Sequence, residues 1–407
     1  MVNVIGLGYI GLPTALMLAS HGVEVVGTDY NKELVESLNA GVPTFKEDGL
    51  DELFKNAVDA GIKFTNNYQH TDIYIVAVPT PYNKFSKKVD ACYVKAAVND
   101  VLDVCNAGAT IIVESTVSPG TIDKEVRPLI AERGFITGKD VHLVHAPERI
   151  LPGNMIYELI NNDRTIGADE PNVAVRVRDI YASFCKGEIV LTDIRTAEMT
   201  KVVENTFRAV NIAFANELSR ICRHDNMDVY EIIRICNKHP RVNIMNPGPG
   251  VGGHCISVDP WFLVGDYPQL TKVIGESMKV NDSQPDFVLE RLQVIMQENN
   301  IKDASRVGLY GITYKENVDD YRDSPTLQLL ESQERHLAAP LKCYDPFLEN
   351  MKLTESQYSD FDAFINDVDI VVVMVKHDHI CHNWDRLKDK IVLDCHNICP
   401  LPNTYRL

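Results

Sequence analysis

Residues 2–29, VNVIGLGYIGLPTALMLASHGVEVVGTD, contain the pattern that decides the fold of the first part of the chain. Val2 to Ile5 is a short apolar strand, and it leads directly into Gly6-Leu7-Gly8-Tyr9-Ile10-Gly11. Leu12 to Ala19 is predicted to form a helix, and Val23 to Gly27 forms a second apolar strand. Strand, GxGxxG, helix and strand in this order are typical of a dinucleotide-binding fold.

The glycines and one acidic residue predict the ligand of this fold. Glycine permits the tight turn, the close approach of a pyrophosphate to the helix N-terminus, and close helix–strand packing. Asp29 follows about 20 residues after the glycines, where an acid accepts hydrogen bonds from the adenosine ribose hydroxyls. It would repel a 2′-phosphate, and no Arg follows at once, so the sequence favours NAD over NADP. The candidate residues are Gly6, Gly8, Tyr9, Ile10, Gly11 and Asp29.

Length and charge limit the architecture and the partners. A chain of 407 residues is too long for one ordinary core, which suggests two or three domains. The formal net charge of −17 argues against nucleic acid or an anionic membrane surface as a partner. We find no apolar run long enough to span a bilayer, no signal peptide, and no disulfide-framework spacing among the ten cysteines. These features predict a cytoplasmic protein with reduced thiols.

Further buried strands and helices alternate after the first motif. Strands are predicted at Asp72–Val78, Thr110–Val113, Val141–Val144 and Arg164–Gly167, with helical stretches such as Val89–Cys105 between them. Such alternation predicts a parallel, doubly wound sheet that binds its ligands at the carboxyl ends of the strands.

Polar and turn-forming residues follow three of these strands. The stretches are Val78-Pro79-Thr80-Pro81, Glu114-Ser115-Thr116 and His145-Ala146-Pro147-Glu148-Arg149. Ordinary turn chemistry explains any one of them. Their occurrence at the end of the sheet where a cofactor and a substrate must lie favours a functional role.

A long helix is predicted from Arg195 to about Arg223, because apolar residues recur there with a period near 3.6. It bridges the first domain to a mostly helical middle. Lys201, Asn205 and Arg208 form a single polar stripe on this helix. By spacing alone, the stripe is interpreted as a solvated helix face with Glu198 nearby.

A second α/β unit follows the helical middle. Its loop Thr313–Pro325 joins the first strand to the first helix, where α/β sheets bind phosphates or nucleotides, although no GxGxxG occurs there. Its strands are predicted at Arg306–Tyr310, Leu341–Tyr344, Asp369–Val375 and Lys390–Asp394. The preceding helices are predicted at Val229–Asn237, Leu270–Asn281 and Pro285–Gln297.

One cysteine stands in a glycine-rich loop within residues 239–261, HPRVNIMNPGPGVGGHCISVDPW. Glycine lets a backbone approach a ligand closely, so this loop can wrap a sugar and present the Cys255 thiol to it. A buried structural thiol is the usual role of a cysteine. The dinucleotide motif in the same chain favours a nucleophile instead, because a redox cofactor and a thiol together oxidise an aldehyde through a thiohemiacetal and a thioester.

Histidines and cysteines gather near the C-terminus without a recognisable metal-binding pattern. They are His377, His379, Cys381, His382, Cys395, His396 and Cys399. Their spacing matches no zinc pattern, so we predict no metal site.

Taken together and in order, these motifs resemble those of the nucleotide-sugar 6-dehydrogenases, a family that includes UDP-glucose dehydrogenase. The resemblance covers essentially the whole chain. It rests on Gly6–Gly11, Val78–Pro81, Glu114–Val117, Pro147–Arg149, Lys201 with Asn205, Gly252–Cys255 with Asp259, and Tyr314–Lys315 with Arg322. The details of residues 145–153 and 239–243 are most similar to the branch of the family that acts on UDP-N-acetylmannosamine. UDP-N-acetylglucosamine and UDP-glucose are the alternative substrates.

The resemblance implies an α/β fold with two Rossmann-like, doubly wound parallel-sheet domains. A helical middle domain with a long connecting helix joins them. The implied limits are an NAD-binding domain at residues 1–193, a helical central and dimerisation domain at 194–298, and a UDP-binding domain at 299–407. It also implies a homodimer or a higher homo-oligomer, in which an arginine matching Arg241 reaches the substrate of the partner.

The implied reaction is oxidation of the C6 alcohol of a UDP-sugar to a carboxylate, with two NAD used in turn. Cys255 is the implied nucleophile, Lys201 and Asn205 stabilise oxyanions or relay protons, and Asp259 and Glu148 assist with water. The division of acid and base among Lys201, Asp259 and Glu148 stays open. Implied cofactor contacts are Thr80 and Thr116 besides the glycine loop. Implied substrate contacts are Arg149, Ile150, Lys201, Asn205, Arg208, His239, Arg241, Gly252, Tyr314, Lys315 and Arg322.

This chain departs from the family after its last predicted strand. Relatives often carry an arginine where this chain has Asp394-Cys395-His396, and a substituting His396 would make UDP binding more dependent on pH. Two rival functions are a two-electron hydroxy-acid dehydrogenase, which needs no thiol, and a non-catalytic NAD-binding protein.

Overall fold

A computed structural model describes residues 1–150, 152–333, 340–402 and 404–407. Leu151, which belongs to the motif at residues 145–153, lies outside the described residues. The chain forms two compact units, Met1–Glu204 and Asn205–Leu407, and each is described by itself. The limit between them falls within α8 (Ile194–His224), the predicted long helix, which has 31 residues.

The first unit is built on an eight-stranded sheet with the strand order β3-β2-β1-β4-β5-β6-β7-β8. The side chains of β1, β2, β4 and β5 are buried along their whole length, as expected for a sheet covered on both faces. The strands are β1 (Val2–Ile5), β2 (Val25–Thr28), β3 (Lys63–Thr65), β4 (Ile73–Val76), β5 (Ala109–Val113), β6 (Val141–His145), β7 (Arg164–Ala168) and β8 (Ile189–Thr192).

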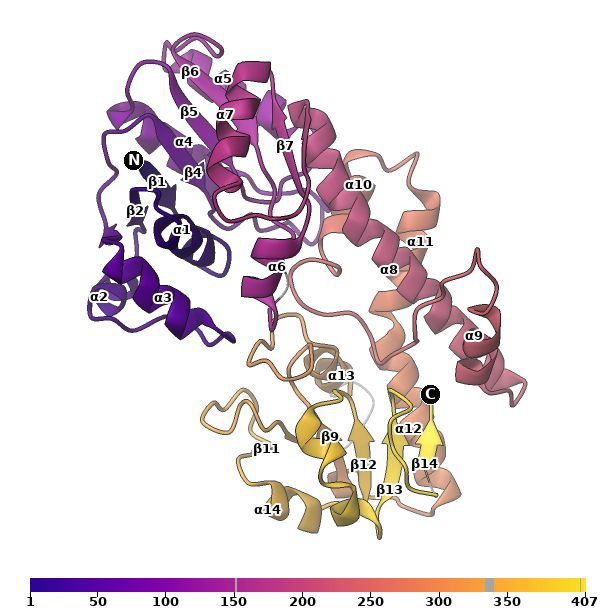
Figure 1. The fold of residues 1–407 in the computed structure, drawn as a ribbon. Helices are drawn as coiled ribbons and strands as arrows, with labels where there is room; N and C mark the ends of the chain where they lie inside the picture. The colour runs from indigo at the N-terminus through magenta and orange to yellow at the C-terminus, as the bar shows by residue number, and fades with distance from the viewer. Residues whose placement is uncertain (151, 334–339, 403) are drawn as a thin grey trace. The chain divides into compact units, whose positions relative to one another are not determined.

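Helices cover both faces of this sheet. Successive residues of a strand point to opposite faces, so neighbouring residues pack with different helices. Ile75 and Ile112 pack with one group of helices, and their neighbours Val76 and Val113 pack with the other. The first group is α1 (Gly11–Ser20), α2 (Lys32–Asn39), α3 (Leu50–Asp59), α6 (Met155–Asn161) and α7 (Pro171–Tyr181). The second is α4 (Cys92–Val104), a π-helical turn (Ile122–Val126) and α5 (Arg127–Glu132). Figure 1 shows this layering around the sheet.

One strand pair departs from the predicted parallel arrangement. β7 runs antiparallel to β6, with Val144 opposite Ala168. The chain between them does not cross the sheet but returns from the end at which β6 finishes. Arg164, the first residue of β7, therefore lies at the end of the sheet where β6 finishes and the chain continues toward Glu148.

The second unit begins with helices and continues into a six-stranded parallel sheet with the order β11-β10-β9-β12-β13-β14. Its helices are the rest of α8, α9 (Val229–Cys236), α10 (Asp259–Asp266), α11 (Lys272–Asp282), α12 (Gln284–Glu298), α13 (Pro325–Gln333), α14 (Phe361–Asn366) and α15 (Asp378–Cys381). Its strands are β9 (Val307–Tyr310), β10 (Lys342–Tyr344), β11 (Gln357–Tyr358), β12 (Ile370–Val373), β13 (Ile391–Asp394) and β14 (Thr404–Arg406). The sequence analysis did not predict α10, α14, α15, β11 or β14.

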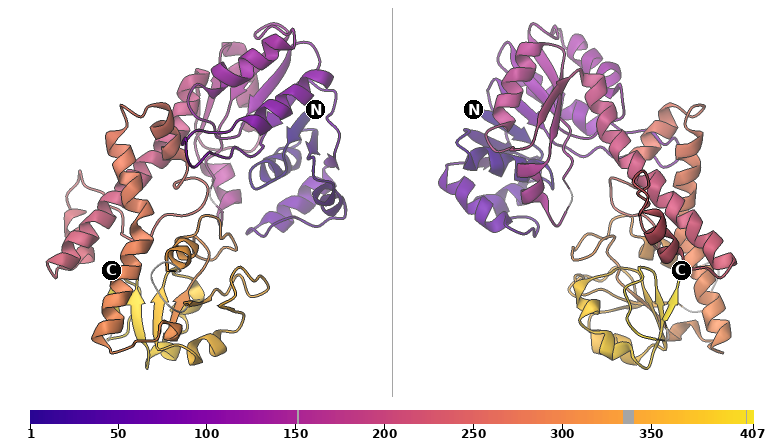
Figure 2. Two further views of the ribbon diagram at one scale, coloured as in Figure 1. Left: turned by 180° about the vertical axis from the view of Figure 1, so that it is seen from behind. Right: turned by 45° about the vertical axis from the view of Figure 1, so that its right-hand side comes forward.

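Helices also cover both faces of the second sheet (Figure 2). Ile370 and Val372 pack with α12 and α13, whereas Val371 and Val373 pack with α14 and α15. The predicted fold class is confirmed: α/β, with two Rossmann-like sheets and a long helical region between them in the sequence. Within the described ranges, no helix has both the length and the apolar character needed to cross a membrane.

Candidate functional site

The glycine loop after β1 has the geometry that a dinucleotide requires. Gly6 has φ +86°, and a Cβ atom there would lie 2.6 Å from the Ala77 carbonyl oxygen. A Cβ at Gly11 would lie 1.8 Å from the Gly6 carbonyl oxygen. At Gly8, in contrast, a Cβ would meet no described heavy atom within 4 Å. Packing of the chain therefore explains Gly6 and Gly11 but not Gly8, for which close approach of a pyrophosphate stays a prediction.

Asp29 is held beside this loop, directly after β2. One carboxylate oxygen accepts a 2.8 Å bond from the Leu7 N–H, and the other accepts a 2.9 Å bond from the Asn31 N–H. Both bonds fix the carboxylate in the position predicted for the ribose-binding acid. Of the other predicted loop residues, Tyr9 stacks on Phe45 with ring centroids 4.4 Å apart, and Ile10 is the N-cap residue of α1.

The three predicted polar stretches follow strands that are neighbours in the sheet. Thr80 follows β4, Thr116 follows β5 and Glu148 follows β6, and these strands are adjacent and parallel. The Ser115 hydroxyl donates a 2.7 Å hydrogen bond to the Val78 carbonyl, which joins the first two stretches. The fold therefore brings these residues to the same end of the sheet as the glycine loop.

A buried polar cluster that the sequence analysis missed surrounds Glu148. Arg164, at the start of β7, donates to the Glu148 carboxylate and lies 3.5 Å from that of Glu114. The Tyr181 hydroxyl donates a 3.0 Å bond to Glu114, and the Arg164 guanidinium carbon lies 4.4 Å from the centroid of the Tyr181 ring. A charged residue heading a buried strand was the available signal, because arginine is seldom buried without a partner.

The two carboxylates of this cluster are in different environments. Burial raises the pKa of Glu114 to about 7, with Arg164 opposing the shift and Glu148 adding to it. Glu148 accepts from Arg164 with one oxygen and from the Arg149 N–H, at 2.6 Å, with the other. Its carboxylate is therefore held in one orientation.

Two predicted substrate contacts follow Glu148 directly. The Arg149 guanidinium pairs with Glu204 on α8 and donates to the Asp163 carbonyl. Ile150 is buried.

The polar stripe on α8 is not a solvated face, and that interpretation was wrong. Lys201 is 6% exposed, Asn205 is 7% exposed, and Glu198 is fully buried. Glu198 accepts hydrogen bonds from the Gly120 N–H at 2.5 Å and the Ile122 N–H at 2.9 Å. Helical spacing shows only that these polar residues share one face of α8. The backbone donors that satisfy Glu198 come from a segment distant in the sequence, so spacing could not reveal that the face is buried. Arg208, the last member of the stripe, is partly buried.

The glycine-rich loop Gly248–Cys255, called the thiol loop below, packs directly against the predicted nucleotide loop, Thr313–Pro325. A Cβ at Gly252 would lie 2.7 Å from the Asp323 carbonyl oxygen, and one at Gly253 would lie 2.8 Å from the Tyr314 ring. The Gly253 N–H donates a 3.0 Å bond to the Arg322 carbonyl. These contacts bring Gly252, Tyr314 and Arg322 together beside the partly buried Cys255.

Asp259 links this thiol loop to the long helix. It is the first residue of α10, is 3% exposed, and accepts a 2.6 Å hydrogen bond from the Asn205 side-chain amide. The Asp259 N–H donates a 2.9 Å bond to the Cys255 carbonyl. Asn205, Asp259 and the thiol loop are therefore one hydrogen-bonded group.

Four other predicted residues have surroundings that bear on their roles. His239 and Arg241 are exposed after α9, and the Arg241 N–H donates a 3.3 Å bond to His239. Arg322 forms a double hydrogen bond to Asp320, at 2.8 and 2.6 Å, and Lys315 is partly buried.

The surroundings of His396 disfavour the cationic form that would substitute for the family arginine. Its Nε2 donates a 2.9 Å bond to the Met374 carbonyl, and burial lowers its pKa. No group of three or more potential metal-ligating side chains was found among the residues that the structure describes.

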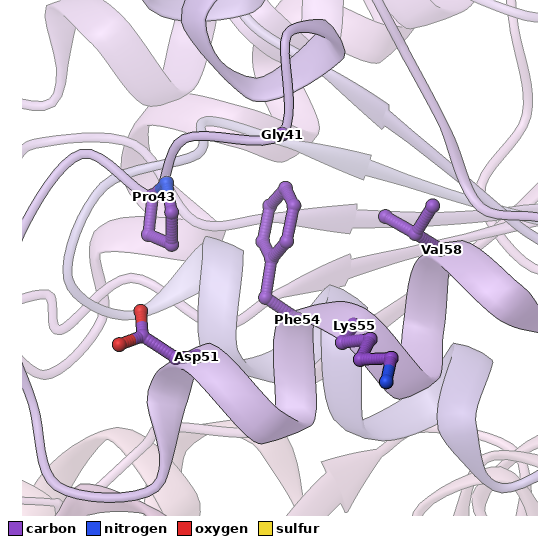
Figure 3. Close-up of a pocket in the computed structure, with 6 residues that line it drawn as sticks. All are labelled: Gly41, Pro43, Asp51, Phe54, Lys55 and Val58. Atoms are coloured by element: carbon purple, nitrogen blue, oxygen red, sulfur yellow. The ribbon is translucent and has the colours of Figure 1, made fainter.

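A hollow of about 330 Å³ lies apart from these residues, along α3 (Figure 3). Its lining residues are Gly41, Pro43, Asp51, Phe54, Lys55 and Val58. None of the predicted site residues is among them, so it does not belong to the site described above.

Three domain models of one family match the chain in order. They describe the UDP-glucose/GDP-mannose dehydrogenase family: its NAD binding domain at residues 1–185, its central domain at 195–283 and its UDP binding domain at 308–400.

Individual relatives match over nearly the full length. The UDP-N-acetyl-D-mannosamine dehydrogenase of Methanocaldococcus jannaschii is 40% identical over 98% of this chain and 92% of its own length. The NDP-N-acetyl-D-galactosaminuronic acid dehydrogenase of Ralstonia nicotianae is 37% identical over 97% of this chain and 95% of its own. The solved structure of the UDP-N-acetyl-mannosamine dehydrogenase of Staphylococcus aureus is 37% identical, with a TM-score of 0.88 over 100% of this chain and 97% of that one.

Proposed function

Because the chain belongs to the UDP-glucose/GDP-mannose dehydrogenase family and carries its NAD and UDP binding domains, we propose that it oxidises UDP-N-acetyl-D-mannosamine at C6 to the uronate. The observation that carries this proposal is the contact between the thiol loop and the nucleotide loop, at Gly253 and Arg322. A sugar whose diphosphate is bound by the nucleotide loop would extend toward Cys255. We also propose the domain limits 1–193 for the NAD-binding domain, 194–298 for the central domain and 299–407 for the UDP-binding domain.

The chemistry assigned to Cys255 follows from the electron count. Oxidation of an alcohol to a carboxylate removes four electrons as two hydrides and consumes one water. Two NAD, bound one after the other, would each supply the acceptor for one hydride. The Cys255 thiolate adds to the carbon of the intermediate aldehyde and forms a thiohemiacetal. Loss of the second hydride leaves a thioester on the sulfur, and water releases the carboxylate and regenerates the thiol.

Asn205 and Lys201 are assigned to the oxygen that becomes negatively charged. A side-chain amide has two N–H donors, and in Asn205 one of them donates to Asp259. The other is available to an oxyanion formed next to Cys255, and Lys201 adds a positive charge from the preceding turn of the same helix.

Asp259 and Glu148 are assigned to the hydrolysis of the thioester. Asp259 is buried at the start of α10 and accepts from Asn205, so it can orient water or accept a proton near the thiol. Glu148 is held by Arg164 and by the Arg149 N–H, which suits a carboxylate that orients water.

The choice of N-acetylmannosamine rests on similarity. The motifs at residues 145–153 and 239–243 resemble that branch of the family, and the relatives from Methanocaldococcus jannaschii and Staphylococcus aureus carry that name. UDP-N-acetylglucosamine, which differs only at C2, and UDP-glucose are the alternatives.

A substrate panel tests this function. Purified protein is incubated with NAD and limiting UDP-N-acetylmannosamine, UDP-N-acetylglucosamine, UDP-glucose or GDP-mannose, and NADH is counted against sugar consumed. We expect two NADH per sugar and the highest kcat/KM with UDP-N-acetylmannosamine. One NADH per sugar would favour a two-electron dehydrogenase, and none with any sugar would favour a binding protein.

We also propose that the protein is a cytoplasmic homodimer whose copies meet along α8. Phe207 is 67% exposed and Phe214 is 52% exposed, and with Val203 and Ile221 they form one apolar stripe on the helix. Large exposed apolar side chains in a row are typical of an interface, and a second copy would cover them. Arg241, which is exposed after α9, is proposed to contact the substrate of the partner.

A further inference from the structure

The nucleotide loop is fastened to the core of its unit by a buried histidine that the proposed reaction does not use. We propose that His377 is a positioning residue for the nucleotide: it holds the nucleotide loop, Thr313–Pro325, in the conformation that binds the diphosphate of UDP. This inference rests on the proposed function, because that loop is assigned to UDP there. His377, Asp345 and Thr313 are all fully buried.

Asp345, which follows β10, fixes the beginning of the loop. Its Oδ2 accepts hydrogen bonds from the Ile312 N–H at 2.6 Å and the Thr313 N–H at 2.9 Å. Its Oδ1 accepts from the Phe347 N–H at 2.8 Å. Burial alone would raise the pKa of Asp345, but the hydrogen bond and the electrostatic attraction from His377, together with the backbone N–H donors, lower it overall. The loop therefore starts on a buried carboxylate.

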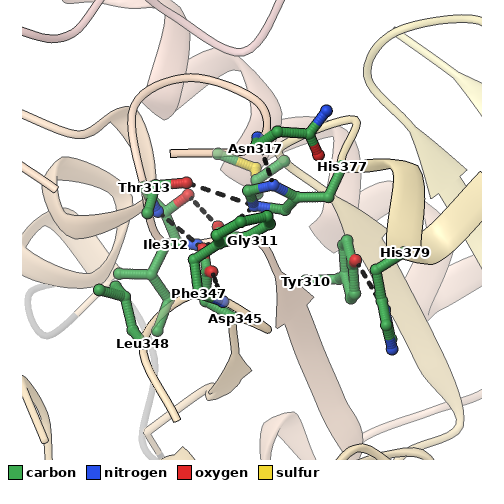
Figure 4. A network of polar contacts seen from close by, with 12 residues as sticks. Tyr310, Gly311, Ile312, Thr313, Asn317, Asp345, Phe347, Leu348, His377 and His379 are labelled. Carbon is green, nitrogen blue, oxygen red and sulfur yellow. Dashed lines mark hydrogen bonds and ion pairs between the residues drawn. The ribbon is translucent and has the colours of Figure 1, made fainter. Parts of the chain in front are cut away.

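His377 connects that carboxylate to the next part of the loop (Figure 4). Its Nδ1 lies 2.9 Å from the Asn317 backbone nitrogen, an obligatory donor, so Nδ1 is the acceptor. The proton is then on Nε2, which lies 3.2 Å from both Asp345 Oδ2 and Thr313 Oγ1. The Thr313 hydroxyl donates to the Lys315 carbonyl at 3.0 Å, so its oxygen can accept. One imidazole thus holds the loop at two places.

Two aromatic rings keep the imidazole in this orientation. Phe347 stacks on it with ring centroids 5.0 Å apart and an interplanar angle of 29°. Tyr310 meets it edge-on at 6.0 Å and 74°. Rotation of the His377 ring would break these contacts and both sets of hydrogen bonds, so the ring has one position.

Asn317 transmits this position to the exposed part of the loop. It has a left-handed backbone with φ +59°, and its side-chain oxygen accepts a 3.0 Å bond from the Asp378 N–H. Lys315 lies between the two points held by His377, Thr313 and Asn317. At the far end, the Arg322 carbonyl accepts from Gly253 of the thiol loop. Loosening the His377 end is therefore expected to displace the groups that meet the diphosphate.

Two substitutions separate the two hydrogen bonds of His377. His377→Asn places an amide oxygen where Nδ1 lies and can still accept from the Asn317 N–H. His377→Gln places its amide where Nε2 lies, so it keeps the bond to Asp345 and loses Asn317. A purely structural role predicts that UDP affinity follows the loss of thermal stability in both variants alike.

The experiment measures the Kd of UDP by titration calorimetry, the split of KM and kcat, and the Tm of each variant. We expect His377→Gln to weaken UDP binding about tenfold and raise KM for the UDP-sugar similarly, since one lost hydrogen bond has about this effect. Its kcat at saturation should change by less than about threefold, and His377→Asn should stay within about threefold of wild type in Kd. Equal Kd in wild type and His377→Gln, or equal losses in both variants, would overturn the proposal.

Two further variants keep the proposal testable if His377→Gln does not fold. Phe347→Leu removes the stacked ring but no hydrogen-bonding side chain, and we expect weaker UDP binding. Phe85→Leu is the matched control, because Phe85 is 98% exposed and lies outside this loop, so it should bind UDP like wild type. If wild-type protein itself does not bind UDP, the assignment of the loop to UDP fails. If wild type binds and Phe347→Leu binds equally well, only the role of His377 fails.

Discussion

The side-chain amide of Asn205 donates a 2.6 Å hydrogen bond to the carboxylate of Asp259, and both residues are buried. The bond joins the long helix α8 to the start of α10, next to the loop of Cys255. It gives Asn205 a fixed orientation and gives Asp259 a partner that carries no charge. Both consequences can be tested separately.

Exchanging these two side chains should separate stability from turnover. Asn205→Asp alone places two carboxylates in contact and should lower the free energy of unfolding by about 2–4 kcal/mol. Adding Asp259→Asn restores a donor and an acceptor, so urea unfolding should return close to wild type. The kcat of the double variant should stay low, because position 259 then lacks a carboxylate. If turnover returned together with stability, Asp259 would have no chemical role.

Cys255→Ser should bind NAD and UDP-sugar nearly normally and stall during turnover. Serine is less nucleophilic at neutral pH, and its ester is harder to hydrolyse than a thioester. Intact-mass analysis after incubation with substrate and NAD should detect a sugar-nucleotide adduct or released aldehyde. Wild-type rates of carboxylate formation by this variant would rule out the thioester route.

NAD should be used far better than NADP. The carboxylate of Asp29 is fixed by the N–H groups of Leu7 and Asn31, so it cannot turn away from a 2′-phosphate. Like charges in contact cost several kcal/mol, so kcat/KM should favour NAD by on the order of 100-fold or more. Steady-state rates with both cofactors measure the ratio, and equal values would contradict the ribose assignment.

Glu114 should make the protein less stable as the pH rises from about 4.5 to about 7. Burial raises its folded-state pKa to about 7 from an ordinary value of 4.5, so the folded state disfavours the ionised form. The resulting stability is fully present below the unfolded pKa and is lost as pH rises through the folded one. One pKa unit corresponds to about 1.4 kcal/mol, so the total change is on the order of 3 kcal/mol.

Glu114→Gln removes this titration and keeps an oxygen for the Tyr181 hydroxyl. Urea unfolding between pH 4.5 and 8 should therefore vary less in the variant than in wild type. Glu132→Gln, at an exposed position, is the control and should leave the profile unchanged. If stability varied with pH in Glu114→Gln as much as in wild type, Arg164 would keep the Glu114 carboxylate ionised in the folded state.

Charges on the apolar stripe of α8 should disrupt a dimer. Phe207→Glu combined with Phe214→Glu places two carboxylates in the proposed interface and should yield monomers in light scattering. Phe85→Glu is the matched control, because Phe85 is 98% exposed and lies outside α8. A wild-type mass for the double variant would place the interface elsewhere.

The sequence was sufficient for features that depend on local pattern. The glycine loop between Val2 and Asp29, the helix near Arg195–Arg223 and the thiol loop around Cys255 each carry their signal within a short stretch. Glycine positions with positive φ or close backbone contacts admit few other residues, so Gly6 and Gly253 could be recognised without a structure. The fold class followed from the alternation of strands and helices.

Tertiary structure decided which polar groups are buried together. Glu198 accepts from Gly120 and Ile122, and Arg164 meets Glu148 only because β7 runs opposite to β6. His377, after β12, is joined to Asp345, after β10, although β9 lies between these two strands in the second sheet. Helical or strand periodicity reports which face a residue occupies, but its hydrogen-bond partners come from segments far away in the chain. Those partners exist only after the strands have paired, so no local pattern could identify them.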